Sequence, residues 1–164
     1  MPQVTLELET SVAPERIRAA LLDFSPDRPT LWPGIEPTLY EVYSVGETSA
    51  LVKEGSKLPG AAMWAVEEYD WSDPTTVTWT VRESNFCTAG SSVAATIEPR
   101  SGGSRVRIVW NRTPTSLTSR LVLALIVATR GKPVAASFEK GMRVLEGRRV
   151  NPPTGARPAQ RSRT

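Results

Sequence analysis

The sequence of 164 residues contains no histidine. This absence excludes a histidine general base, a Ser-His or Cys-His nucleophile pair and any imidazole ligand to a metal. The chain has one cysteine, Cys87, which excludes an internal disulfide and a cysteine zinc site. A single thiol suits a reducing compartment. We therefore expect a cytoplasmic protein that uses neither a metal nor a cofactor.

Long hydrophobic runs are also missing. The longest, Leu121 to Ala128, is far shorter than the ~20 residues that span a bilayer. The first ten residues alternate apolar and polar side chains, which is not the pattern of a signal peptide. The composition is that of an ordinary globular chain. We expect one domain over residues 1–150 and a disordered basic tail over residues 151–164, which hold three prolines and three arginines.

Charge is unevenly distributed along the chain. The net charge is only +3, but residues 1–98 carry 6 basic and 15 acidic groups, whereas residues 99–164 carry 14 basic and 2 acidic groups. Such asymmetry indicates either a contact with nucleic acid or membrane, or two oppositely charged halves that fold against each other.

Hydrophobic periodicity predicts an α+β chain with a central run of strands. Residues 4–9 alternate as a half-buried strand does, residues 14–24 have helical spacing, and a single helical turn fits residues 30–32. Turn-like separators then divide six strand candidates of an antiparallel meander, at residues 39–45, 48–54, 62–71, 76–82, 90–98 and 104–112. Apolar residues from Leu117 to Leu145 trace one face of a long helix, in which Gly131-Lys132-Pro133 predicts a kink or short break.

Four segments carry a resemblance to a known family, and they are Val12-Ala13-Pro14-Glu15, Leu31-Trp32-Pro33-Gly34-Ile35, the pair Met63–Tyr69 and Val77–Trp79, and Ser101–Val106. With the order of elements, they resemble the START-like or SRPBCC superfamily, the Bet v 1-type helix-grip fold. The chain looks most like the bacterial polyketide cyclase/dehydrase branch. The resemblance covers roughly residues 3–149. None of the segments is a catalytic signature, and similar folds host many functions.

The resemblance implies a seven-stranded curved antiparallel sheet wrapped around a long C-terminal helix, with two short helices between strands 1 and 2. It also implies a cavity between sheet and helix that takes lipids, polyketides or other apolar molecules. In that fold the last strand pairs with the first, so Arg105 and Arg107 would face Glu7 and Glu9. The charge asymmetry is then mostly that of complementary halves of one sheet.

Apolar and aromatic side chains on segments that face this cavity are the candidate ligand-binding residues. An apolar pocket with few polar groups is the usual form of a small-molecule site, and indole rings stack on planar ligands. The alternative is that these side chains fill the core. The candidates are Trp32, Tyr40, Trp64, Trp79, Trp110, Leu121, Leu125 and Phe138.

Two residues are candidates for catalysis. A carboxylate of Glu54 in an apolar cavity could move a proton, and Arg82 could stabilise an enolate oxygen. The alternative places both side chains in water at strand ends. Cys87 lacks an activating neighbour in sequence, which favours an inert buried thiol. Glu67, Glu68 and Asp70 favour a solvated acidic face over a cation site.

Two further segments leave alternatives open. The apolar run 121–128, flanked by Arg120 and Arg130, is expected to be buried in the grip of the sheet; self-association, as in a homodimer, and an interfacial membrane contact are the alternatives. The arginines of the tail could bind nucleic acid or anionic lipid, but no aromatic is interleaved to stack bases, which disfavours sequence-specific recognition.

The leading functional hypothesis is a protein that binds an apolar or aromatic small molecule. The alternative is a polyketide cyclase or dehydrase in which the same cavity folds a poly-β-keto chain, so that proximity supplies much of the rate.

Overall fold

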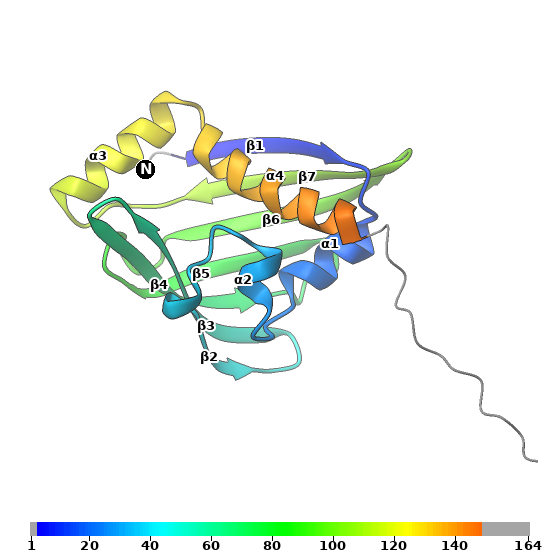
Figure 1. Ribbon diagram of the computed structural model, residues 1–164, viewed down its shortest axis with the longest axis horizontal. Helices are drawn as coiled ribbons and strands as arrows, with labels where there is room; N and C mark the ends of the chain where they lie inside the picture. Colours follow the sequence, from blue (N-terminus) through cyan, green and yellow to red (C-terminus); the bar gives the residue numbers. More distant parts are fainter. Residues whose placement is uncertain (1–2, 149–164) are drawn as a thin grey trace, which may run out of the picture.

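The computed structural model describes residues 3–148 as seven strands and a set of helices (Figure 1). The predicted basic tail over residues 151–164 lies outside the described residues. The strands are β1 (Gln3–Thr10), β2 (Glu41–Val45), β3 (Ser49–Leu58), β4 (Ala61–Asp70), β5 (Thr76–Ser84), β6 (Ser92–Arg100) and β7 (Gly103–Asn111). The helices are α1 (Pro14–Leu21), α2 (Arg28–Leu31), the 3₁₀ turn η1 (Pro37–Leu39), α3 (Leu117–Ala128) and α4 (Lys132–Gly147).

The strands form one antiparallel sheet in the order β1-β7-β6-β5-β4-β3-β2. β2 to β7 follow one another as hairpins. β1 pairs with the last strand, β7, as expected, and forms one edge of the sheet. Its register sets Glu7 opposite Arg107 and Glu9 opposite Arg105. Opposite charges that face each other across strands stabilise a sheet by about 0.2–1 kcal/mol per pair. The two oppositely charged halves of the sequence therefore meet in the sheet.

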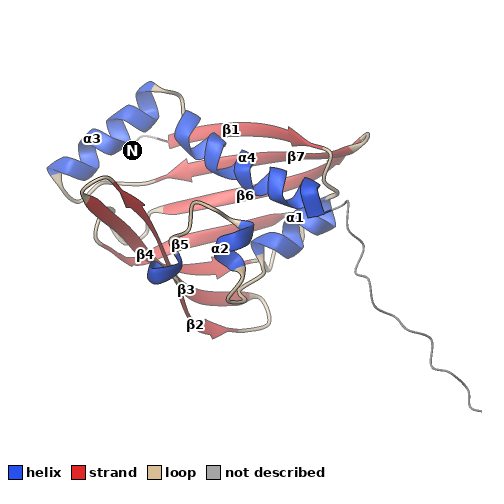
Figure 2. Ribbon diagram, in the orientation of Figure 1, coloured by secondary structure: helices blue, strands red, loops and turns tan. Residues whose placement is uncertain are grey.

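Helices cover one face of this sheet (Figure 2). α4 lies across it, and α1 and α2, the two short helices between β1 and β2, lie beside α4 over the same face. α1 is shorter than the predicted helix over residues 14–24, since it ends at Leu21. Phe24 lies beyond the helix and packs against the Tyr69 ring, with the ring centroids 5.1 Å apart. The predicted α+β helix-grip architecture is confirmed.

The predicted break in the C-terminal helix is confirmed and is sharp. α3 and α4 meet at an angle of 76°. Gly131, which immediately precedes α4 as its N-cap, has φ of 75°, a conformation that favours glycine. A Cβ there would also lie 2.5 Å from a methyl carbon of Val4 and 2.8 Å from one of Leu6, so β1 leaves room only for glycine. The bend directs α3 away from the axis of α4 (Figure 1).

Membrane-spanning length is not reached by any single helix of residues 3–148. α3 and α4 taken together are long and apolar enough, but the 76° bend separates them.

The core lies between the sheet and the helices, and strand alternation selects its residues. On β5, Val77, Trp79 and Val81 are buried, while the threonines between them are only half-buried. On β7, Val106, Ile108 and Trp110 are buried in the same way. The faces predicted from alternation on these two strands are therefore confirmed.

Candidate ligand-binding cavity

A cavity of about 550 Å³ lies between the inner face of the sheet and helices α3 and α4. Its wall is mostly aliphatic and aromatic, with a small number of polar side chains. The lining residues used below are Trp32, Glu54, Leu58, Met63, Ala65, Glu67, Trp79, Trp110, Arg112, Val122, Leu125, Ile126 and Phe138.

Aromatic rings form one wall of the cavity. The Phe138 ring on α4 lies between two indoles, with its centroid 5.9 Å from that of Trp32 and 6.2 Å from that of Trp79. The Trp32 indole is fixed because its Nε1 donates to the carbonyl of Ala20 at 3.0 Å. α4 can approach Trp32 closely because residue 141 is glycine; a Cβ there would overlap the indole ring. The wall therefore consists of aromatic rings that pack against one another, with the Trp32 ring held by a hydrogen bond.

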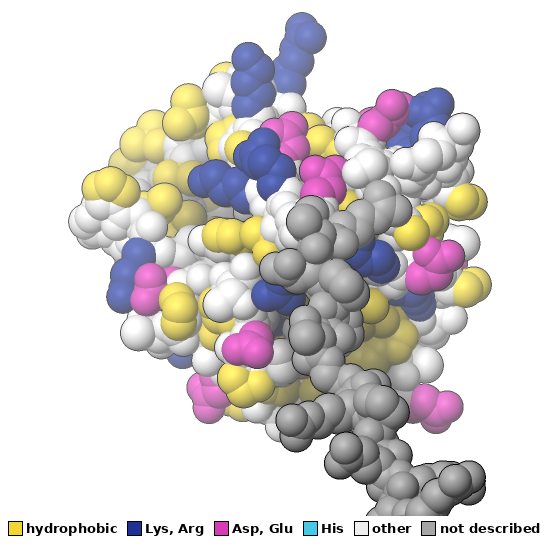
Figure 3. Space-filling model, turned by 45° about the vertical axis from the view of Figure 1, so that its right-hand side comes forward, with side chains coloured by type: hydrophobic (Ala, Val, Ile, Leu, Met, Phe, Trp, Pro, Cys, Tyr) yellow, Lys and Arg dark blue, Asp and Glu magenta, His cyan; other side chains and the backbone are white. Residues whose placement is uncertain are grey.

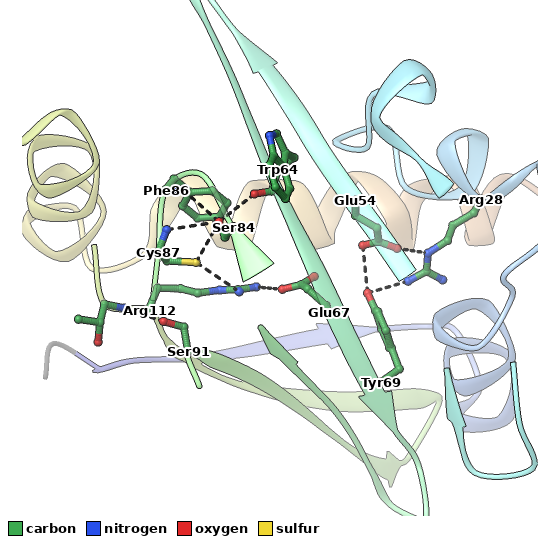
Figure 4. Close-up of polar contacts among 11 residues, drawn as sticks. Arg28, Glu54, Trp64, Glu67, Tyr69, Ser84, Phe86, Cys87, Ser91 and Arg112 are labelled. Atoms are coloured by element: carbon green, nitrogen blue, oxygen red, sulfur yellow. Dashed lines mark hydrogen bonds and ion pairs between the residues drawn. The ribbon is translucent and has the colours of Figure 1, made fainter. Parts of the chain in front are cut away.

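A buried ion pair between Glu67 and Arg112 supplies the second feature of the wall (Figure 4). Glu67 is inward because it alternates with Ala65 and Tyr69 on β4, and Arg112 follows the end of β7. The two residues are 4% and 6% exposed. Burial raises the pKa of Glu67, against the opposing effect of Arg112. Burial disfavours the charged guanidinium of Arg112, but Glu67 offsets this, and the pKa of Arg112 lies above its ordinary value.

The Arg112 guanidinium is incompletely satisfied. Its Nη2 bonds Glu67, and its Nη1 lies 3.9 Å from the Sγ of Cys87. Its Nε is buried and has no hydrogen-bond partner among the described residues. An unpaired buried N–H costs about 1–3 kcal/mol. Arg112 therefore places a cation in the wall of the cavity, with one N–H left unpaired.

A second buried network holds Glu54, and it is fully bonded. Arg28 Nε lies 2.5 Å from one Glu54 oxygen, and the Tyr69 hydroxyl donates to the other at 3.0 Å. Arg28 also donates to the carbonyls of Leu21 and Asp23 and to the Tyr69 hydroxyl. Burial, together with the nearby Glu54 carboxylate, raises the pKa of Tyr69 well above its ordinary value. This network fastens α2 to β3 and β4.

Five of the eight predicted ligand-binding residues line the cavity, and they are Trp32, Trp79, Trp110, Leu125 and Phe138. Trp64 does not, because β4 directs Met63 and Ala65 inward and Trp64 outward, where Lys53 Nζ lies 4.7 Å from its ring centroid. Leu121 is 67% exposed on the outer face of α3.

Tyr40 also lies outside the cavity lining and packs, half-buried, against the core. Its hydroxyl is buried with no partner among the described residues. Burial raises the pKa of Tyr40 to about 12.

The two catalytic candidates do not meet. Glu54 lines the cavity, within the Arg28 network. Arg82 is exposed and pairs with Glu68, which is on the outward face of β4, so it is not placed to act with Glu54. The reason is that β5 alternates Val81 inward and Arg82 outward.

The sequence missed the Glu67–Arg112 pair. The expected solvated acidic face is wrong for Glu67, because strand alternation directs this side chain inward while Glu68 and Asp70 point outward. Glu67 is two residues from both Ala65 and Tyr69, and this spacing in a strand could have predicted that it points inward with them. Cys87 is buried, as expected, and is a free thiol.

The expected burial of the run 121–128 is wrong for most of its length. Leu123 is buried, and Val122 and Ile126 line the cavity, but Leu121 and Leu125 are exposed. The bend at Gly131 turns α3 so that only one of its sides meets the protein.

Comparisons with known proteins identify other proteins with this fold. No family model matches the chain, and no curated protein matches its sequence. Solved structures do match. An aromatase/cyclase, ZhuI, from Streptomyces sp. R1128 superposes with a TM-score of 0.74 at 11% identity, over 94% of this chain and 98% of its own. A protein from Thermus thermophilus gives 0.71 at 21% identity, over 89% and 99%.

A START superfamily protein from Mycobacterium smegmatis gives a TM-score of 0.66 at 13% identity, over 89% of this chain and 95% of its own. These similarities cover nearly the whole described chain. The protein therefore has the START-like, polyketide cyclase-like helix-grip fold that its sequence resembles.

Proposed function

We propose that this protein binds an apolar or aromatic small molecule in the cavity between the sheet and the C-terminal helices. The observation that carries the proposal is the cavity itself, about 550 Å³ in volume and lined mainly by apolar side chains. Small-molecule sites typically measure about 300–1,000 Å³ and combine an apolar wall with few polar groups.

Two features of the wall define the chemistry of the ligand. The rings of Trp32, Trp79 and Phe138 suit a planar or polycyclic molecule. The Arg112 guanidinium, a cation in the cavity wall, suits a carbonyl or phenolic oxygen on that molecule. The ligand class that fits both is an aromatic or polyketide-like compound with at least one oxygen acceptor.

Blocking the cavity tests the proposal. Val122 lines the cavity from α3, whereas Thr118, on the same helix, is exposed and is not a lining residue. Val122→Trp should weaken binding of the fluorescent probe 1-anilinonaphthalene-8-sulfonate more than tenfold, and Thr118→Trp should leave it unchanged. Equal binding to both variants, or no binding to the unaltered protein, would reject a ligand site in this cavity.

A pair of ligands tests the polar anchor without altering the protein. Fluorenone and fluorene have the same ring system, but only fluorenone has a carbonyl acceptor. A hydrogen bond to a charged donor contributes about 1.5–3 kcal/mol, so fluorenone should displace the probe at a concentration at least about tenfold lower. Equal displacement would show that Arg112 does not anchor the ligand.

An alternative function, favoured by one observation, is a polyketide cyclase or dehydrase. The supporting observation is the Glu67 carboxyl, which lies in the cavity wall with its pKa raised by burial, in a fold similar to that of the Streptomyces aromatase/cyclase. A carboxylate would remove a proton from a carbon between two carbonyls, and that carbon would attack a third carbonyl. The resulting alkoxide takes a proton, and loss of water then completes the dehydration.

Matched variants test this alternative. Glu67→Gln should abolish turnover of a synthetic poly-β-ketone, and Glu68→Gln, at the exposed neighbouring position, should not. Glu54→Gln reports separately on the candidate in the Arg28 network. If the unaltered protein binds ligand tightly but turns over no substrate, the cyclase or dehydrase function is rejected and only the binding function is supported.

We also assign the protein to the cytoplasm. The support is its single, free and buried thiol, Cys87, which suits a reducing compartment. Fractionation of cells that express the full chain tests this assignment, and recovery from an oxidising compartment would contradict it.

A further inference from the structure

Exposed hydrophobic side chains gather on α3. Leu117, Leu121 and Leu125 are 76%, 67% and 61% exposed, and Val127 is 40% exposed. Figure 3 shows hydrophobic side chains clustered at the upper left, the side on which α3 lies in Figure 1. Contiguous exposed apolar patches on a folded protein mark interaction sites.

Helical spacing separates the two sides of α3. The three leucines recur every four residues and therefore lie along one side of the helix. Ser119 and Leu123 are buried on the other side, where Val122 and Ile126 line the cavity. One side of α3 is thus a wall of the cavity, and the other presents leucines to the exterior.

The exposed leucines lie beside the mouth of the cavity. Leu125 lines the cavity and is also largely exposed, which places it at the rim. Leu58, at the end of β3, has the same two properties, with 41% exposure. The mouth therefore lies between α3 and the β3–β4 hairpin, whose turn continues into the exposed Ala61.

Charge along α3 and the start of α4 has one sign. Residues 113–138 contain Arg120, Arg130 and Lys132 and no acidic residue. All three basic residues are exposed. A second hollow, of about 380 Å³, runs beside α3 and is lined by Arg120 together with Leu123 and Val127. Leucines with flanking cations form the pattern of a helix that lies in a membrane interface.

We propose that the rim surface, defined as Leu117, Leu121, Leu125, Val127 and Leu58 with the cations Arg120, Arg130 and Lys132, docks on an anionic lipid bilayer. Docking would insert the leucines at the level of the headgroups and set the cavity mouth against the bilayer. A second copy of the chain fits less well, because a two-fold contact would bring both sets of cations together. An anionic bilayer offers the complementary charge, and each basic residue near such a surface raises affinity about fivefold.

Vesicle flotation with the full chain tests the proposal. The vesicles are phosphatidylcholine alone or phosphatidylcholine with 30% phosphatidylglycerol. The protein should bind the anionic vesicles, bind neutral vesicles at least tenfold more weakly, and dissociate as salt is raised. Leu121→Glu should weaken anionic binding more than tenfold, since it replaces an inserting side chain by a repelled one. Val45→Glu is the matched control, because Val45 is 57% exposed on the edge strand β2.

Each outcome either supports docking through the rim surface or overturns it. Absence of binding to anionic vesicles overturns the proposal, and so does equal binding to both vesicle types. Anionic binding that Leu121→Glu does not reduce overturns it as well, because the arginines beyond residue 148 would then be responsible. Light scattering should give a monomer; a dimer that Leu121→Glu dissociates would mean that a second copy covers the leucines.

Probe binding by the same variant keeps this proposal distinct from the proposed function. Leu121 does not line the cavity, so Leu121→Glu should bind 1-anilinonaphthalene-8-sulfonate in solution as the unaltered protein does. Loss of vesicle binding with retained probe binding supports docking. Loss of both would indicate that the substitution disturbs the fold and would overturn the assignment of Leu121 to the docking surface.

Discussion

Adjacent glutamates on β4 provide a controlled test of the buried ion pair. Glu67 pairs with Arg112, and these side chains are 5% and 7% exposed, whereas Glu68 pairs with Arg82, at 39% and 61%. Glu67→Ala leaves the Arg112 charge buried without its partner, which should destabilise the protein by about 3–5 kcal/mol. Glu68→Ala breaks a pair that water screens, and should cost at most about 1 kcal/mol.

Urea unfolding followed by tryptophan fluorescence measures the difference. With an m-value of about 2 kcal/mol/M, Glu67→Ala should lower the midpoint by about 1.5–2.5 M, and Glu68→Ala by no more than about 0.5 M. The double variant Glu67→Leu with Arg112→Met should recover most of the loss, since it removes both buried charges. Equal midpoints for the two single variants, or no recovery in the double variant, would show that burial does not set the strength of this pair.

Three further results are expected. Gly141→Ala should destabilise the protein by about 1–2 kcal/mol in urea, because its Cβ would overlap the fixed Trp32 ring, whereas Gly147→Ala, with open space around its Cβ, should be neutral or stabilising by up to about 1 kcal/mol. Stability should fall as pH rises above 10: the unfolded chain releases phenolic protons near 10, while Tyr69 and Tyr40, whose pKa values are raised, the latter to about 12, keep theirs when folded. Tyr40→Phe should reduce that fall without loss of stability at pH 7, since its hydroxyl has no partner among the described residues. A flat alkaline profile, or a loss above about 1 kcal/mol for Tyr40→Phe at pH 7, would contradict these assignments.

Local pattern predicts most of the elements and half of the site. Alternation on β5 and β7 identifies the inward faces that carry Trp79 and Trp110. Alternation also applies to β4, where Glu67 shares a face with Ala65 and Tyr69. Three acidic residues in a run of four nevertheless led to the prediction of a solvent-exposed face. A buried carboxylate that stays ionised needs a partner such as a cation, and the partner of Glu67, Arg112, lies 45 residues later in the chain. No local pattern predicts such a pairing.

The C-terminal helices illustrate the same division. Gly131-Lys132-Pro133 predicts a break, since proline removes a backbone donor and glycine permits a positive φ. The angle of 76° is not in the local pattern, because it depends on how the break packs against Val4 and Leu6 of β1. That angle decides which side of α3 meets the cavity and which leucines remain exposed.

Periodicity and turn residues are signals from neighbouring positions, and they were enough to predict the order of the elements, the antiparallel sheet and the break before α4. Composition alone excludes histidine chemistry. The folded chain was needed to learn that Glu67 meets Arg112, that Glu54 is held by Arg28 and Tyr69, and that Arg82 and Leu121 point outward. These facts escape a local pattern because burial and pairing are properties of residues far apart in the chain. Whether a charged side chain is buried in an ion pair or exposed, and whether a leucine is in the core or on the surface, depends on the residues that the fold places around it.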